Sequence, residues 1–159
     1  MCLNDMKIGT AFNRRIGNKI KMKHLELFIE IDRNASNTYT GIQYRVVLFI
    51  DKQHNGATLT QSDIISGARN QKNLNNRSRF IIMLDKCYFI NDSTKQTIKI
   101  DKYFNLMKYG QVQYSGDAST SHEGGDIATN GLFIMIWPLN INSFADSINM
   151  SYRLCYTDN

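Results

Sequence analysis

Five basic residues near the amino terminus have the type and spacing to bind phosphate groups. Lys19, Lys21 and Lys23 alternate with apolar residues, so in an extended strand their side chains would point the same way, about 6.6 Å apart. Arg14 and Arg15 precede them in an expected loop. Such a row could bind a chain of phosphates by neutralising it and releasing its counterions. The alternative is an ordinary solvated strand face.

The charge of the whole chain is concentrated in this segment. The first 25 residues contain six lysines or arginines and one acid, a net charge of +5, which equals the formal charge of the 159-residue chain. The remaining residues contain thirteen basic and thirteen acidic side chains and are neutral. Charge that served only solubility would be spread over the surface. The segregation therefore favours a polyanionic partner.

The sequence lacks the motifs that support common catalytic chemistry. No glycine-rich nucleotide-binding motif, no HExxH zinc motif and no GxSxG nucleophile motif occurs. The three histidines are scattered, and Cys2, Cys87 and Cys155 form no CxxC pair. We expect no enzyme, no catalytic residue and no required cofactor. The cysteines are interpreted as buried thiols, with a bridge between Cys2 and Cys155 as the alternative.

Alternation of apolar and polar residues with a period of two dominates the chain and predicts β-strands. Residues 148–158 show the clearest alternation. In residues 19–32 the apolar positions change from even to odd numbers, which predicts a β-bulge near Lys23–Leu25. Further strands are predicted at residues 41–52, 79–90, 94–104, 109–115 and 131–137.

Three predicted strands contain runs that are apolar on both faces, at residues 46–50, 80–84 and 132–137. In a two-layer sandwich only one face of each sheet meets the core. A second apolar face therefore predicts cover by another subunit, and strand ends lying under loops are the alternative.

One short helix is predicted after residue 59. Thr60 can cap its first turn, Asp63 can complete a capping box, and Gly67 can end it. The elements together predict an all-β sandwich or barrel formed by a single domain, residues 1–159. No run of about 18 apolar residues and no secretion signal occurs, so we expect no membrane span and synthesis in the cytosol.

Several segments, taken in order, resemble the capsid proteins of small circular single-stranded DNA viruses that encode a replication initiator. They are "GTAFNRRIGNKIKMKHLEL", "YRVVLFIDKQHNG" and "LNNRSRFIIMLDKCY". The same order of elements, ending in "SYRLCYTDN", is also similar to coat proteins of the satellite tobacco necrosis virus kind, including their terminal Y-T-D. The resemblance covers about residues 8–158, and the order of the motifs makes it more specific than any one of them.

The resemblance implies a single eight-stranded antiparallel jelly roll, with two packed four-stranded sheets and one short helix in a loop. It implies a structural protein of the virion, made in the host cytoplasm or nucleus, of which about sixty copies close into a small icosahedral (T=1-like) shell. The enclosed genome would be a single-stranded nucleic acid, DNA rather than RNA. The N-terminal basic segment, residues 1–17, would face the inside of the shell.

The resemblance to the satellite virus proteins also implies Ca²⁺ at subunit interfaces. The ligands carried over are the carboxylate of Asp158 and the backbone carbonyls of Ile16 and Lys19. Ca²⁺ takes six to eight oxygen ligands, usually with carboxylates among them.

Two other functions are compatible with the sequence. A monomeric or trimeric jelly-roll module could bind carbohydrate or another ligand through Tyr109, Tyr114 and Trp137. A single-strand binding protein would stack bases on aromatic residues beside the basic row. The row from Lys19 to Lys23 contains no aromatic residue, so this second alternative ranks lower.

Overall fold

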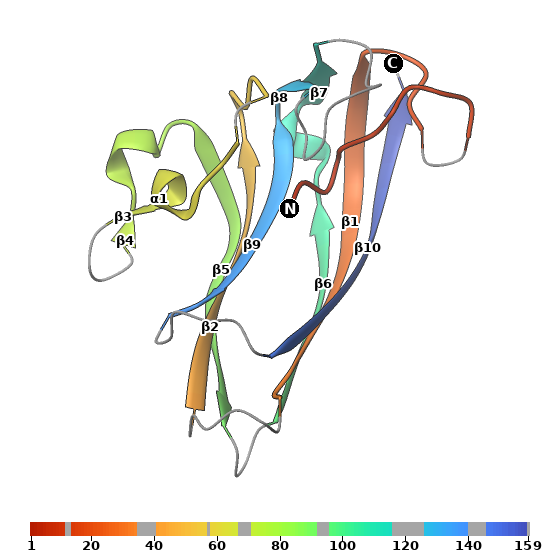
Figure 1. Cartoon of the computed structure of the whole chain (residues 1–159). Helices are drawn as coiled ribbons and strands as arrows, with labels where there is room; N and C mark the ends of the chain where they lie inside the picture. The colour runs from red at the N-terminus through yellow and green to blue at the C-terminus, as the bar shows by residue number, and fades with distance from the viewer. Residues whose placement is uncertain are drawn as a thin grey trace.

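The chain folds into a β-sandwich of antiparallel strands, shown as a computed structural model in Figure 1. The structure describes residues 1–11, 14–34, 41–56, 58–66, 71–91, 96–115, 126–139 and 146–158. In chain order, these residues form β1 (Lys19–Asp32), β2 (Gly41–Asp51), α1 (Gln61–Ile64), β3 (Ile65–Ser66), β4 (Gln71–Lys72), the 3-10 helix η1 (Leu74–Asn76), β5 (Phe80–Asn91), β6 (Thr97–Asn105), the 3-10 helix η2 (Met107–Tyr109), β7 (Gln111–Tyr114), β8 (Ile127–Thr129), β9 (Gly131–Pro138) and β10 (Ser147–Asp158).

The five-stranded sheet is organised around β1. One side of β1 pairs with β10 along its length. The other side pairs with β7 at Lys19–Lys21 and with β6 from His24 to Asp32, and β8 pairs with β7. The first strand therefore lies beside the last, as in the long return connection of a Greek key.

The second sheet contains three strands in the order β5-β2-β9, and β3 and β4 form a separate small hairpin. The prediction of an all-β sandwich is confirmed. The described residues form sheets of five, three and two strands, however, rather than two sheets of four. The difference arises because η2 divides the strands beside β1 into β6 and β7, and because β3 and β4 lie outside the two main sheets.

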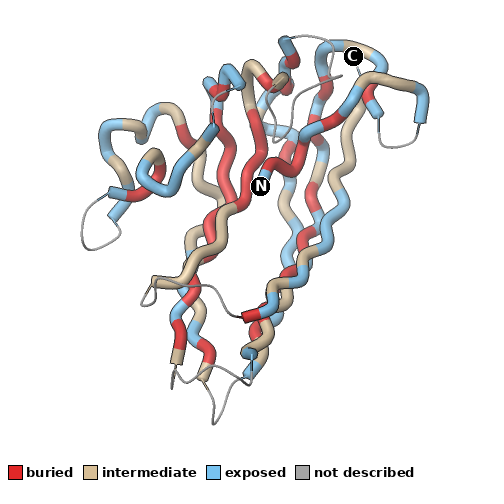
Figure 2. Tube along the Cα trace, viewed as in Figure 1, coloured by how far each residue is buried: buried red, intermediate tan, exposed pale blue. Residues whose placement is uncertain are grey.

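A β-bulge in β1 brings its apolar residues into the core, as the sequence predicted. The pairing with β10 shifts register between Met22 and His24. Ile20 and Met22 are buried before the bulge, and odd-numbered residues are buried after it, namely Leu25, Leu27, Ile29 and Ile31. Lys23 is exposed and His24 half-buried, so both lie on the outward side. Figure 2 shows the alternation of buried and exposed residues in the sheet.

The outer face of the three-stranded sheet is also apolar, and the chain itself covers part of it. Phe49 of β2 is fully buried, and its ring packs against Phe133 of β9 and Phe80 of β5, with centroids 5.7 and 5.5 Å apart. Ile64 of α1 lines the same small hollow as Phe80. The loop that contains α1 thus covers part of this face, as in the alternative of strand ends lying under loops.

The helix α1 begins as predicted. The backbone N–H of Thr60 donates a hydrogen bond to Oδ2 of Asp63 at 2.7 Å, which is the reciprocal contact of a capping box. The helix is one turn long and runs directly into β3. Gly67, predicted to end the helix, lies outside the described residues. None of the helices in the described ranges is long and apolar enough to cross a membrane.

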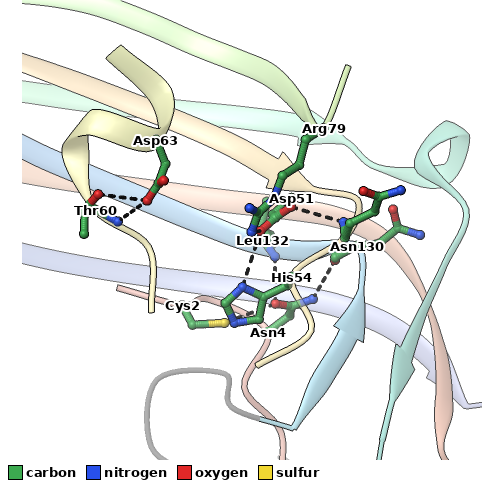
Figure 3. A network of polar contacts seen from close by, with 10 residues as sticks. Cys2, Asn4, Asp51, His54, Thr60, Asp63, Arg79, Asn130 and Leu132 are labelled. Atoms are coloured by element: carbon green, nitrogen blue, oxygen red, sulfur yellow. Dashed lines mark hydrogen bonds and ion pairs between the residues drawn. The ribbon is translucent and has the colours of Figure 1, made fainter. Parts of the chain in front are cut away.

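A buried ion pair fixes the end of β2 against the start of β5 (Figure 3). Asp51 is fully buried and accepts two hydrogen bonds from Arg79, at 2.8 and 2.7 Å. It also accepts one from the N–H of Gln53 at 3.1 Å, and Nδ1 of His54 lies 3.4 Å from it. Burial alone raises the pKa of Asp51, but the contacts from His54 and Arg79 outweigh burial and hold the pKa below its usual value.

We predict that Asp51→Ala lowers the free energy of unfolding by about 2–4 kcal/mol, since it leaves Arg79 without its carboxylate. The expected loss is below that of a fully enclosed pair because the Arg79 side chain is 26% exposed. The lowered pKa of Asp51 means that its contribution is present above the unfolded pKa and is lost as the pH falls below about 4. Urea titrations at pH 7 and pH 3 measure both effects.

Lys99→Ser provides the matched control, since it breaks the solvent-exposed pair between Lys99 and Glu30. This variant should unfold at nearly the wild-type urea concentration. Equal losses in the two variants would contradict the role given to Asp51.

Candidate nucleic-acid interface

The three predicted lysines form an exposed row on the outer face of the five-stranded sheet. Lys19, Lys21 and Lys23 are exposed, while the residues between them are buried. The register neighbours of Lys21 are uncharged, Gln111 on β7 and Thr157 on β10. No residue in the described ranges forms an ion pair with the three lysines.

Beyond the bulge, two acidic residues on this face are paired within the protein. Glu26 lies 3.7 Å from Arg153 on β10, and Glu30 lies 2.8 Å from Lys99 on β6. Asp101 of β6, opposite Phe28, is exposed and adds negative charge there. The lysine end of β1 therefore attracts a polyanion more strongly than the far end does.

Arg15 is not part of the exposed row, although it was predicted to contact phosphate. It is fully buried, and its guanidinium donates hydrogen bonds to Met6 O at 3.0 Å and Gly17 O at 2.6 Å. A third bond reaches Asn18 Oδ1 at 3.0 Å, and the guanidinium lies 4.0 Å from the ring centroid of Tyr114. Its donors are thus used inside the fold, and in this conformation Arg15 is unavailable to phosphate.

Arg14 is exposed but lies away from the lysines. Its Nη1 donates to Ile8 O at 3.3 Å, and its own carbonyl accepts a hydrogen bond from Tyr156 at 2.8 Å. Tyr156 is the register partner of the buried Met22, so it lies on the inward side of β10. The structure therefore places Arg14 at the edge of the sandwich, separated from the lysine row by β10.

The residues carried over as calcium ligands come together, but not as a complete site. Oδ2 of Asp158 accepts a hydrogen bond from the backbone N–H of Ile16 at 3.1 Å, so one carboxylate oxygen faces a donor. Among the described residues, no group of three carboxylate, histidine or cysteine side chains could hold a metal. A Ca²⁺ site between subunits, with oxygen ligands from more than one chain, stays a prediction.

The fold also places aromatic residues beside the row, which sequence reasoning missed. His24 follows Lys23 on the outward side of the bulge and stacks on Tyr103 of β6, with ring centroids 5.3 Å apart. Tyr103 is 64% exposed. No local pattern could reveal this pair, because it depends on the register between β1 and β6.

The 3-10 helix η2 carries a further exposed lysine. The backbone N–H of Leu106 donates to Lys23 O at 2.8 Å, which holds the start of η2 beside β1. Lys108 of η2 is exposed, with its ammonium 5.0 Å from the ring centroid of Tyr109.

The aromatic residues considered for a ligand-binding module do not share one surface. Tyr114 is buried and donates a hydrogen bond to Asn4 O at 2.7 Å. Trp137 lies opposite Arg45 in the three-stranded sheet, and Tyr109 lies in η2 beside the other sheet. These positions weaken the ligand-binding alternative.

An open depression of about 900 Å³ runs along the inward side of β10. The N-terminal segment borders it, with Leu3 and Met6 buried against the core. Apolar side chains of β10 line the other side and are only partly covered, among them Tyr152, Leu154 and Tyr156. The edge of the sandwich thus leaves apolar surface open at β10.

The cysteines are all free, but they differ in exposure. Cys2 is buried, Cys155 is half-buried and Cys87 is exposed, so the interpretation of buried thiols is correct only for Cys2. Burial raises the pKa of the Cys2 thiol to about 12, which leaves it neutral and unreactive at pH 7.

Comparison of the sequence with protein-family models and with curated proteins identifies no family. No protein-family model matches the sequence, and no curated protein matches it. What the chain does is therefore inferred from its residues and their geometry.

We predict that Arg15→Ala lowers the free energy of unfolding by about 3 kcal/mol, because it removes a buried guanidinium and leaves several acceptors unsatisfied. Arg14→Ala is the matched control, since it removes the same charge one residue earlier from an exposed side chain. It should change stability little. Urea unfolding of both variants measures the difference, and equal effects would contradict a structural role for Arg15.

Proposed function

We propose that the protein is a structural viral capsid protein that self-assembles into a small icosahedral (T=1-like) shell around a single-stranded nucleic acid, DNA rather than RNA. The observation that carries this proposal is the row of exposed lysines on one face of a sandwich in which residues 26–159 have no net charge. The ordered motifs that resemble capsid proteins support it. The protein would act in the virion, after synthesis in the host cytoplasm or nucleus.

The strand pairing supports a jelly roll as the finer description of the fold. β1 lies beside β10 in one sheet, and β2 lies beside β9 in the other. In the chain, the pair β2 and β9 therefore lies inside the pair β1 and β10, so the two pairs are nested. A chain folded back on itself in two Greek keys gives this kind of nesting. The resemblance of residues 8–158 to capsid proteins points to the same architecture.

The lysine row would bind nucleic acid weakly in one copy and strongly in an assembled shell. Three lysines neutralise a few phosphates, which gives salt-sensitive binding. When many copies present the same row to one strand, each further contact becomes intramolecular and adds avidity. A row of this size therefore suits a protein that acts in many copies.

The open depression along β10 supports association with a second copy. Its partly covered apolar lining lies at an edge strand, whose outer N–H and C=O groups are a natural surface for association. Asp158 borders the same depression, so an interface there would also bring this carboxylate toward oxygen atoms of a neighbouring subunit. Ca²⁺ between subunits would require such oxygen ligands.

We predict that the purified protein sediments as a megadalton particle with excess absorbance at 260 nm, because a shell of about sixty 18.3-kDa subunits would enclose nucleic acid. Analytical sedimentation recorded at 260 and 280 nm measures both properties. A boundary near 18.3 kDa that persists at high protein concentration and with added Ca²⁺ would contradict the proposal and favour a monomeric binding module.

We predict that the triple variant Lys19→Ser, Lys21→Ser, Lys23→Ser forms intact particles with less nucleic acid. Its binding to a single-stranded oligonucleotide should depend less on salt, with the slope of log K against log[salt] reduced by about 2, or 0.7 for each of three phosphate contacts.

The matched control removes three exposed lysines elsewhere, Lys52, Lys72 and Lys86. It changes the net charge by the same amount and should leave the nucleic-acid content near the wild-type value. Equal losses from both triple variants would show that net charge, rather than the row on β1, determines packaging.

A further inference from the structure

The bulge in β1 places a phosphate-binding residue next to an aromatic pair. Lys23 and His24 are consecutive, and the register shift turns both to the outward side of the five-stranded sheet. His24 then stacks on Tyr103, which β6 brings to the same face. The lysine row therefore ends at an aromatic step formed by His24 and Tyr103.

The geometry of the step leaves room for a further ring. The two rings are nearly parallel, with an interplanar angle of 28° and centroids 5.3 Å apart. Tyr103 nevertheless remains 64% exposed, so its contact with His24 covers only part of the ring. Phe28, the next aromatic residue along β1 on this face, is 37% exposed. Exposed aromatic surface beside exposed lysines is the combination that single-strand binding proteins use.

We propose that the His24–Tyr103 step binds an unpaired base of the nucleic acid whose phosphates lie on Lys19, Lys21 and Lys23. This inference rests on the proposed function and gives it a chemical basis for selecting single strands. The bases of a duplex are stacked on each other and cannot reach a protein ring without being unpaired. An unpaired base can cover the exposed part of Tyr103 and exclude water from both rings.

The charges around the step favour approach of a polyanion from the lysine end. Glu26 lies opposite Tyr103 in the register, but Arg153 lies 3.7 Å from it and offsets its charge. Farther along β1, Asp101 of β6 lies opposite Phe28 and is exposed, so it would repel a phosphate there. The bound strand is therefore expected to leave the sheet after the aromatic step.

The test compares two oligonucleotides of equal charge: a single-stranded (dT)20 and a 20-unit abasic strand with the same phosphates. Binding is measured by fluorescence anisotropy at one salt concentration for the wild-type protein and for Tyr103→Ala, Tyr103→Phe and Phe89→Ala. Tyr103→Phe keeps the ring. Phe89→Ala is the matched control, since it removes an aromatic residue that is 52% exposed on β5 of the other sheet. Thermal unfolding of each variant confirms that it is folded.

The wild-type protein should bind (dT)20 at least tenfold more tightly than the abasic strand, because stacking of one base contributes that much or more. Tyr103→Ala should remove this preference and leave affinity for the abasic strand unchanged, while Tyr103→Phe and Phe89→Ala should retain the preference. The inference is overturned if the wild-type protein binds both strands equally, binds neither, or keeps its preference in Tyr103→Ala.

The two failures can be told apart. Particles that contain nucleic acid, together with equal binding of both strands, would overturn the base-binding step and leave the capsid proposal standing. Failure to form particles would overturn the capsid proposal whatever the oligonucleotides show, and a base preference that depends on Tyr103 would then favour the single-strand binding alternative.

Discussion

The five-stranded sheet depends on the β-bulge at Lys23 and His24. Side chains alternate along a strand, so without the bulge the apolar residues after it would face solvent. Four of them are at most 1% exposed, namely Leu25, Leu27, Ile29 and Ile31. Burial of each contributes about 1.5–3 kcal/mol, so the set contributes about 6–12 kcal/mol, as much as the net stability of many domains. One extra residue in β1 therefore decides which face of the sheet meets the core.

The basic residues that are neighbours in the sequence have different physical roles in the fold. Arg15 has a planar guanidinium that can donate in several directions at once, and the fold uses it to join Met6, Gly17 and Asn18. Lysine has a flexible stem and a strongly hydrated ammonium, and the lysines stay on the surface. The net charge of the first 25 residues is thus larger than the positive charge that a ligand could contact, because Arg15 is buried and stabilises the N-terminal segment.

The features predicted correctly from the sequence are those set by local pattern. The slip in alternation located the bulge, and the spacing of Thr60 and Asp63 located the cap of α1. The burial of Arg15 was missed because its partners are carbonyl groups and a tyrosine ring that only the fold assembles. The position of Tyr103 was missed for a similar reason, since it follows from pairing between two strands distant in sequence. The separate strands predicted at residues 94–104 and 109–115 correspond to β6 and β7 on either side of η2, but the sequence pattern did not indicate that both strands pair with β1.

The two outer faces of the sandwich differ in a way that bears on assembly. Around Phe49 and Phe133, the outer face of the three-stranded sheet is apolar and partly closed by the chain's own loop. The outer face of the five-stranded sheet is largely polar and carries exposed lysines at one end. A subunit that encloses a genome needs one face for the polyanion and must attach to its neighbours by other surfaces. The open apolar edge at β10 lies between the two faces, where such an attachment would leave the lysines free.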